Sequence, residues 1–442
     1  MVGTQYEFFL LPGQTLNPVF TTNGSNPPAA ISGDFNLEII TNPSGSSFNL
    51  PSGYQGLATF PGGTGQQLSL IVGNINVVDF ANSDIINAGP GQDTIGGGFG
   101  DTLNGGSGTQ LLVGTIADES IVGGSAGNET IFGGFGDTIS GGGSANETIG
   151  GAQGDTITAG NGVEFIDASA GFQSINGGAA ADETIWGGAG DTINGGSGNS
   201  VVIGGAAGDV IIGGGGTTFI DGSRGNQSIT GGFSGNETIW GGAGDTISSG
   251  AGANVTIGGS PHDNISGGGG LTFIDGSSGN QTVTGGYAGN ETIWGGTGDS
   301  INGGNGANVT IGGAQFDTIT GGVGNEFVDG SAGKQLITGG VGGNETIWGG
   351  AGDTVVGSSG PALIGFGAGP EFFSDSGPGG GNDTVGAFSQ TAGDRILTSG
   401  GDSLSTILST QTISGGNTIL SFANGTTLTL LGVSGVNGSF FS

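Results

Sequence analysis

The sequence predicts an all-β protein whose central part is a parallel two-sheet β-solenoid with 18-residue coils. The first observation is a 54-residue repeat, in which the Glu-Thr-Ile segment at 129–131 returns at 183, 237, 291 and 345. The second is a finer spacing: the successive core Ile positions from Ile185 to Ile239 advance in steps of 8, 10, 8, 9, 9 and 10. Each Ile is followed by a Gly-rich corner, so six half-turns make three coils with one strand in each sheet.

The composition fits this architecture and limits the partners. The 111 Gly residues recur at fixed offsets from Ile, where corners need positive φ or a close backbone approach. A balance of 36 acidic against 3 basic residues gives a net charge of −33, which argues against nucleic-acid and anionic-membrane partners and favours bound cations. The chain has no Cys, no stretch long enough to span a bilayer, and no basic and apolar leader of the cleavable type at its start.

Three segments differ in regularity. Residues 1–70 do not follow the repeat, contain an aromatic cluster and alternate with period two, which predicts a small N-terminal β domain or cap. Residues 71–366 carry the Gly-rich solenoid. Residues 367–442 lose the repeat and alternate again, which predicts a β-rich cap over the last strands of the solenoid.

The corners resemble the nonapeptide of the repeats-in-toxin (RTX) family, Gly-Gly-x-Gly-x-Asp-x-U-x, over about two thirds of the chain. Close matches are Ala-Gly-Pro-Gly-Gln-Asp-Thr-Ile, which contains Asp93, and Gly-Gly-Gly-Asn-Asp-Thr-Val, which contains Asp383. The resemblance implies a calcium-bound β-roll. Residues 419–433 and the closing Phe-Phe-Ser are similar to the uncleaved C-terminal secretion region of such proteins, which implies type I export to the cell surface or the extracellular space.

Inside the repeats, one corner places an Asp or a Gln every 18 positions, in the order Asp, Asp, Gln. This corner is one residue shorter than the family consensus, because Asp191 follows Ile185 by six positions rather than seven. The opposite corner gives the series Glu183, Val201, Phe219, Glu237, Val255 and Phe273, in which two of every three residues cannot bind metal, so we expect metal along one edge only. The candidate metal ligands, including the two consensus-length sites, are Asp93, Asp137, Asp155, Asp191, Asp209, Asp245, Asp263, Asp299, Asp317, Asp353 and Asp383.

Two explanations of the Asp row remain open. Carboxylates stacked about 5 Å apart repel each other by roughly 3 kcal/mol at an effective dielectric near 20. Ca²⁺ could bridge each Asp pair, with corner carbonyls as the remaining ligands. Alternatively, each Asp accepts hydrogen bonds from corner N–H groups, and Gln in every third coil relieves the repulsion.

Aromatic residues recur on the outer face of one predicted sheet. The middle Ile of each strand points inward and its neighbours point outward. Regular exposed aromatics on a Gly-rich acidic surface mark an interface, although they could instead shield the sheet. The candidate interface residues are Phe132, Trp186, Trp240, Trp294, Trp348, Phe165, Phe219, Phe273 and Phe327.

The sequence therefore favours a secreted structural protein, stabilised by Ca²⁺, that assembles with copies of itself into a filament, sheath, surface layer or biofilm matrix. The alternative is a monomeric extracellular module for adhesion, glycan binding or ice binding. The polar Thr rows of the second sheet are the basis for ice binding, and stacking of sugars on the exposed aromatics is the basis for glycan binding. Catalysis is not expected, because His262 is the only histidine and the repeat explains its corner position. Partners other than the chain itself would be cell-surface glycans.

Overall fold

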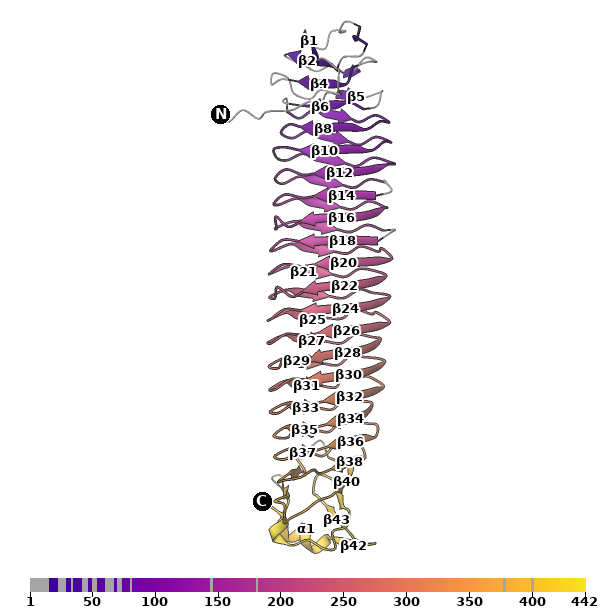
Figure 1. Cartoon of the computed structure of the whole chain (residues 1–442). Helices are drawn as coiled ribbons and strands as arrows, with labels where there is room; N and C mark the ends of the chain where they lie inside the picture. Colours follow the sequence, from indigo (N-terminus) through magenta and orange to yellow (C-terminus); the bar gives the residue numbers. More distant parts are fainter. Residues whose placement is uncertain are drawn as a thin grey trace. The chain divides into compact units, whose positions relative to one another are not determined.

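The structure, a computed structural model, describes residues 16–22, 29–32, 35–41, 47–49, 54–59, 67–69, 74–79, 82–143, 146–179, 182–376, 379–398 and 401–442. The chain divides into two compact units, Met1–Gly216 and Thr217–Ser442. In each unit the strands stack in parallel as two sheets, and every coil contributes one strand to each sheet (Figure 1).

The first unit has a sheet of longer strands and a sheet of shorter ones. The longer strands are β1 (Leu16–Thr22), β2 (Phe35–Thr41), β4 (Gly56–Thr59), β6 (Asn76–Val78), β8 (Asp93–Gly97), β10 (Gln110–Gly114), β12 (Asn128–Phe132), β14 (Asn146–Gly150), β16 (Val163–Ala168), β18 (Asp182–Gly187) and β20 (Ser200–Gly204). The shorter strands are β3 (Ser47–Asn49), β5 (Gln67–Ser69), β7 (Ile85–Asn87), β9 (Thr102–Asn104), β11 (Ser120–Val122), β13 (Thr138–Ser140), β15 (Thr156–Thr158), β17 (Ser174–Asn176), β19 (Thr192–Asn194) and β21 (Val210–Ile212).

The second unit repeats this arrangement. Its longer strands are β22 (Thr217–Gly222), β24 (Asn236–Gly241), β26 (Asn254–Gly258), β28 (Leu271–Gly276), β30 (Asn290–Gly295), β32 (Asn308–Gly312), β34 (Asn325–Asp329), β36 (Glu345–Trp348), β38 (Ala362–Gly365) and β40 (Asn382–Gly386). Its shorter strands are β23 (Ser228–Thr230), β25 (Thr246–Ser248), β27 (Asn264–Ser266), β29 (Thr282–Thr284), β31 (Ser300–Asn302), β33 (Thr318–Thr320), β35 (Leu336–Thr338), β37 (Thr354–Val356), β39 (Phe372–Ser374) and β41 (Arg395–Leu397).

The core is a double column of aliphatic side chains between the sheets. Ile185 is paired with Ile203 in one sheet and Ile193 with Ile211 in the other, and all four are fully buried. These pairings confirm the predicted two-sheet solenoid with 18-residue coils. Because the strand period is two, only the middle residue of each triplet faces inward, which explains why a chain so rich in Gly still has a continuous apolar core.

The N-terminal segment continues the same sheets. Parallel pairs join β1 to β2, β2 to β4 and β4 to β6, so the strands before residue 70 differ from the repeats in regularity rather than in sheet type. Of the aromatic cluster predicted there, Tyr54 is buried. Residues Tyr6, Phe8, Phe9 and Phe60 lie outside the described residues.

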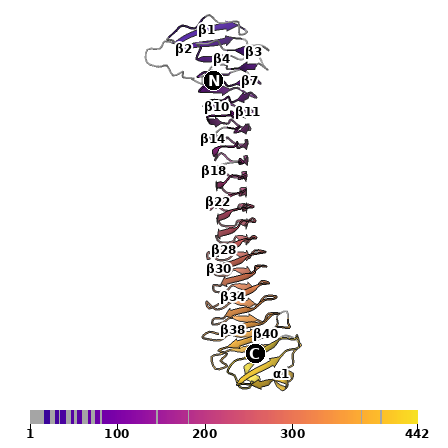
Figure 2. The same cartoon turned by 90° about the vertical axis from the view of Figure 1, so that its right-hand side faces the viewer.

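The C-terminal segment ends the second unit with a different pairing. Strands β42 (Thr412–Ser414), β43 (Asn417–Ser421) and β44 (Thr427–Leu430) form an antiparallel meander, and β44 also pairs in parallel with β40. Figure 2 labels β40 beside the C-terminus. The segment also contains helix α1 (Leu404–Thr410) and the 3₁₀ turn η1 (Gly438–Phe440), which the sequence analysis did not predict. Helix α1 buries Ile407, and among the described residues no helix is both long and apolar enough to cross a membrane.

Candidate metal-binding edges and exposed aromatic rows

The two corners of each coil carry two rows of acidic side chains, which we name by their commonest residue. The Asp edge precedes the short strands and consists of Asp84, Asp101, Glu119, Asp137, Asp155, Gln173, Asp191 and Asp209 in the first unit and of Gln227, Asp245, Asp263, Gln281, Asp299, Asp317, Gln335, Asp353, Glu371 and Asp394 in the second. The Glu edge lies in the long strands and consists of Asp93, Gln110, Glu129, Glu147, Glu164, Glu183 and Val201 in the first unit and of Thr218, Glu237, Val255, Thr272, Glu291, Val309, Glu326, Glu345, Ala362 and Asp383 in the second.

The Asp residues in the repeats of the Asp edge accept backbone hydrogen bonds, whereas Oε2 of Glu119 and Oε2 of Glu371 in the same row accept none of ordinary geometry. In Asp191, Oδ1 accepts the backbone N–H of Gln173 in the previous coil at 2.7 Å, and Oδ2 accepts the N–H of Gly188 in its own corner at 2.7 Å. The N–H of Asp191 in turn donates to Oδ1 of Asp209 at 2.9 Å. The same contacts recur around Asp245 and Asp299, so each of these side chains links its own corner to the previous coil by hydrogen bonds.

The Gln residues end each run of two Asp. The corner before Gln173 is one residue longer, since Gln173 follows Ile166 by seven positions, and its Nε2 donates to the carbonyl of Ala168 at 3.0 Å. An uncharged amide in every third coil limits the like-charge contacts within the row. Burial raises the pKa of Asp191 to about 6, while N–H donors from Gln173 and Gly188 lower it and the charge of Asp209 raises it.

The two consensus-length sites lie on the other edge. Parallel pairing places Asp93 beside Gln110 on the Glu edge, and Asp383 belongs to the same edge in the second unit. Oδ1 and Oδ2 of Asp93 accept the N–H groups of Ile75 at 2.9 Å and Gly89 at 3.0 Å. Neither oxygen of Asp383 accepts a hydrogen bond of ordinary geometry, and burial raises its pKa to about 7. The predicted ligand set therefore spans both edges.

The register corrects the expected composition of the Glu edge. The sequence analysis placed Phe219 and Phe273 in this row, but Thr218 and Thr272 occupy it, because the preceding corners are one residue shorter than those before Glu237 and Glu291. Phe219 is instead paired with Thr238 on the outward-facing row. The corrected row contains adjacent Glu residues in both units, and a uniform step of 18 does not reveal the pairs Glu164–Glu183 and Glu326–Glu345.

Several Glu side chains on this edge are buried without satisfied oxygens. Glu164 and Glu183 are 3% and 2% exposed, and neither oxygen of either residue accepts a hydrogen bond of ordinary geometry. Burial raises the pKa of Glu164 to about 7 despite nearby N–H groups of Gly160 and Gly162. Burial, followed by the charge of Glu164, raises the pKa of Glu183 to about 7.

The two edges fit a cation unequally. Each Asp oxygen that already accepts a backbone hydrogen bond offers a metal only its second lone pair, whereas an oxygen without such a bond offers both. In the part of the chain that the structure describes, no three His, Cys, Asp or Glu side chains gather as a metal site. Any ion would therefore need backbone carbonyls among its ligands, as Ca²⁺ accepts readily.

The predicted aromatic residues lie on the outer face of the long-strand sheet. Trp186, Trp240, Trp294 and Trp348 are 46% to 51% exposed, and Phe132 is 46% exposed. Each Trp lies across the Gly of the next coil: a β-carbon at Gly204 would stand 2.3 Å from Cε3 of Trp186. The glycine thus provides the space in which the indole rests flat against the sheet.

The predicted Phe residues form a second row beside the Trp. Phe165 is paired with Thr184, whereas Trp186 is paired with Asp167, so the two rings belong to neighbouring rows of the same face. Phe165, Phe219, Phe273 and Phe327 are 38% or 39% exposed. Other exposed aromatics at the corners were missed, although a 54-residue spacing relates Phe233 to Tyr287 and could have revealed them.

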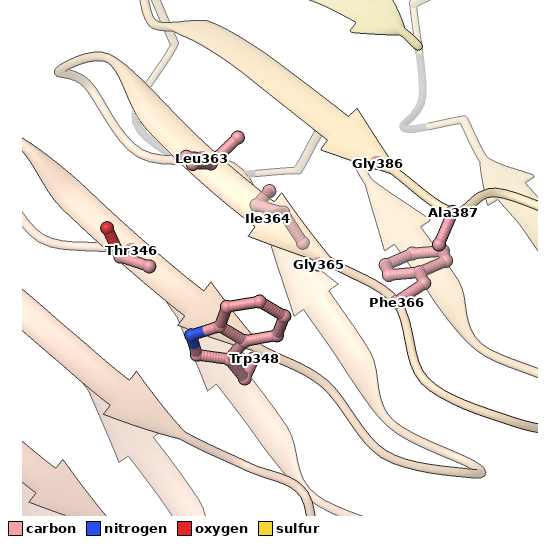
Figure 3. A pocket seen from close by; sticks show the side chains of 8 residues that line it. All are labelled: Thr346, Trp348, Leu363, Ile364, Gly365, Phe366, Gly386 and Ala387. Carbon is pink, nitrogen blue, oxygen red and sulfur yellow. The ribbon is translucent and has the colours of Figure 1, made fainter. Parts of the chain in front are cut away.

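A recess of about 240 Å³ adjoins the last Trp of the row. Its lining comes from β36, β38 and β40 and includes Trp348, Leu363, Phe366 and Ala387 (Figure 3). Phe366 stacks on Phe388 with ring centroids 5.9 Å apart. The aromatic face of the second unit therefore ends in an apolar recess.

Comparison with protein families gives one match. A model described as the RTX calcium-binding nonapeptide repeat matches residues 81–101, 123–157, 186–220, 217–247, 231–265 and 302–334. The match supports Ca²⁺ binding and so confirms the predicted cofactor, and it indicates a secreted, extracellular protein. Repeats of this kind are typically non-catalytic. Searches of curated proteins and of solved structures found no match to the chain.

Proposed function

We propose that this chain, an RTX-like β-roll protein that binds Ca²⁺, is an extracellular structural protein that associates laterally with copies of itself. The observation that carries the proposal is the row of half-exposed Trp residues at intervals of 54 positions. A chain used in this way needs no active site, and we propose that it is not an enzyme.

The energetics support a repeated contact. Covering the exposed half of one Trp removes about 100 Å² from water, which corresponds to about 2.5 kcal/mol before the costs of association. The second unit carries three such residues, Trp240, Trp294 and Trp348, each over a Gly of the following coil. A second copy offers the same period, so all three contacts can form together.

The recess beside Trp348 and the net charge add two conditions. The recess has an apolar lining suited to a side chain of a neighbouring copy. The net charge of −33 makes copies repel one another, so assembly should need Ca²⁺ or salt to reduce the repulsion. Growth through the ends is a further part of the proposal. In the C-terminal segment, the ring of Phe440 already stacks on Phe388 of the same chain, with ring centroids 5.9 Å apart, so this face of Phe440 is used within the chain.

The test replaces Trp186, Trp240, Trp294 and Trp348 together by Ser and examines the secreted protein by electron microscopy and sedimentation, with and without millimolar Ca²⁺. We expect lateral assembly to be lost while circular dichroism stays unchanged. The matched control replaces the exposed corner aromatics Phe172, Phe233, Tyr287 and Phe316 by Ser and should assemble like the wild type. Filaments or sheets with unchanged lateral spacing in the Trp variant would contradict the proposal. The alternative function, a monomeric adhesion, glycan-binding or ice-binding module, would then be favoured.

A further inference from the structure

The two acidic edges leave open which carboxylates hold a divalent cation. On the Asp edge, both carboxylate oxygens of Asp191 and of Asp299 already accept hydrogen bonds from backbone N–H groups, so these side chains are the weaker candidates. A cation there would have to share each carboxylate oxygen with a backbone N–H group that already uses one of its two lone pairs. The Glu edge lacks such bonds at several positions and is the better candidate.

The Glu edge contains a run of four adjacent Glu residues in the first unit, Glu129, Glu147, Glu164 and Glu183, and a single pair in the second, Glu326 and Glu345. Glu164 is paired with Glu183 across β16 and β18, and Glu326 is paired with Glu345 across β34 and β36. All four are at most 5% exposed. Neither oxygen of Glu164, Glu183 or Glu345 accepts a hydrogen bond of ordinary geometry, and Oε2 of Glu326 also lacks one. Buried charges that lack partners are costly, so a proton or a cation must accompany them.

Oxygen atoms converge beside the first pair. The point where a β-carbon of Gly178 would stand is 2.4 Å from the carbonyl oxygen of Gly160, 3.0 Å from Oε1 of Glu183 and 3.2 Å from Oε2 of Glu164. One carbonyl and two carboxylates from two successive coils thus face the same space. At the second pair, the corresponding point at Gly340 is 2.4 Å from the carbonyl oxygen of Gly322 and 2.8 Å from Oε2 of Glu326, so a carbonyl and one carboxylate of the pair meet there.

Gln110 shows what the same position does when it carries no charge. Its Nε2 donates to the carbonyls of Gly89 at 3.3 Å and Gly91 at 3.2 Å in the previous coil, and its Oε1 accepts the N–H of Gly106. In the Glu coils an oxygen replaces that amide nitrogen opposite the carbonyl. Two oxygens facing each other repel unless a positive centre lies between them.

We infer that divalent cations bind between the paired carboxylates Glu164 and Glu183 in the first unit and Glu326 and Glu345 in the second, with corner carbonyls as further ligands. Carboxylate and carbonyl oxygens are the donors that Ca²⁺ takes, six to eight of them in flexible geometry. Glu237 and Glu291 are not part of these sites, because Thr and Val flank each of them in the row.

The test compares three isosteric double variants of the full chain: E164Q/E183Q for a paired site, E237Q/E291Q for unpaired Glu, and D191N/D209N for the Asp edge. Gln110 already occupies the Glu edge, so Gln should fold at these positions. Calcium binding is measured by equilibrium dialysis, and the melting temperature is measured in chelator and in Ca²⁺. Mg²⁺ serves as the second ion, since its near-octahedral demand suits the pair less well.

In the E164Q/E183Q variant we expect one class of Ca²⁺ sites to weaken by at least tenfold and the Ca²⁺-dependent rise in melting temperature to shrink. The E237Q/E291Q variant should bind Ca²⁺ as the wild type does. The D191N/D209N variant should melt lower in chelator and in Ca²⁺ by similar amounts. If the paired variant folds poorly, E326Q/E345Q in the second unit tests the same site.

The pH dependence of Ca²⁺ binding gives a second readout, for which the neighbours of each pair matter. Glu147 and Val201 flank the first pair in the row, and Val309 and Ala362 flank the second, with Asp383 close enough to raise the pKa of Glu345. Protons should compete with Ca²⁺ for these carboxylates, so Ca²⁺ binding should weaken as the pH falls. Wild-type Ca²⁺ binding in both Glu-pair variants, or loss of binding only in the Asp-edge variant, would overturn the inference. Neither result depends on whether the chain assembles.

Discussion

The Asp edge and the Glu edge of the same coils both carry carboxylates, but the carboxylates of the two edges differ in their hydrogen bonding to the backbone. An Asp carboxylate is short enough to accept one N–H from its own corner and one from the previous coil, as Asp299 does with Gly296 and Gln281. A Glu carboxylate extends one methylene further, and that of Glu291 in the same coil accepts no hydrogen bond of ordinary geometry. The Asp edge therefore holds the backbone together, while the Glu edge carries buried oxygens that remain available.

This difference distinguishes carboxylates that stabilise the fold from carboxylates that can bind a cation. Both edges are buried, and burial raises the pKa of Asp317 to about 6 and of Glu326 to about 7. Desolvation alone thus does not identify a metal site. What distinguishes the edges is whether backbone donors already use the oxygen atoms.

The largest expected effect comes from removing one carboxylate of the Asp edge. Asp299→Ala leaves the buried N–H groups of Gln281 and Gly296 without acceptors, so the free energy of unfolding should fall by about 2 to 6 kcal/mol. Urea unfolding followed by circular dichroism measures the loss.

The matched control lies on the other edge of the same coil. Glu291→Val adopts a residue type already present at Val255 and Val309 in this row, and it should change the free energy of unfolding by no more than about 1 kcal/mol. Equal losses in the two variants would contradict the division of roles between the edges.

A second effect concerns pH in the absence of metal. Burial raises the pKa of Glu183 from its usual 4.5 to about 7, with a smaller contribution from the charge of Glu164. Between these values the folded protein binds more protons than the unfolded chain, so stability falls as the pH rises from about 4.5 to about 7 and then levels off. Glu291 and Glu345 shift in the same direction and add to the effect.

Melting curves of the chelated protein across this pH range provide the measurement. We expect the melting temperature to fall by several degrees on going from mild acid to neutral pH, and Ca²⁺ to restore it above pH 7. A melting temperature that rises with pH in chelator would contradict the raised pKa values of the Glu edge.

Much of the fold could be predicted because it is encoded by short-range periodicity. The Ile spacing correctly indicated the two sheets, and the pairings of Ile185 with Ile203 and of Ile193 with Ile211 follow directly from it. Helix α1 was not predicted, since the period-two alternation around it masked the helical spacing of Leu404, Ile407 and Leu408.

The sites were predicted less completely, because coil lengths vary by one residue. A fixed step of 18 follows the Asp edge, where the variations cancel, but it misplaced Phe219 and Phe273 on the Glu edge. It also hid the adjacency of Glu164 and Glu183, whose separation in the sequence exceeds that step by one. The residues that hold the cation and those that meet a second copy stay predictions.

The smallest expected effect tests the backbone that the Asp edge requires. The residue before each Asp or Gln adopts positive φ, which Gly208 accommodates at 82° and Phe172 adopts at 56°. A bulky side chain in this region costs about 1 kcal/mol, and the ring of Phe172 is 67% exposed, so it gains little from burial. Phe172→Gly should therefore raise the free energy of unfolding, measured in urea, by up to about 1 kcal/mol.

The matched change for this last prediction is Gly208→Ala, where an added β-carbon would meet no atom within 4 Å, so only the backbone conformation is tested. This variant should be destabilised by about 1 kcal/mol. Opposite signs in the two variants would confirm that the corner geometry, rather than contacts of the side chain, sets the preference. A destabilised Phe172→Gly variant would mean that the ring stabilises the corner through its contact with Gly190, and the strain argument would fail.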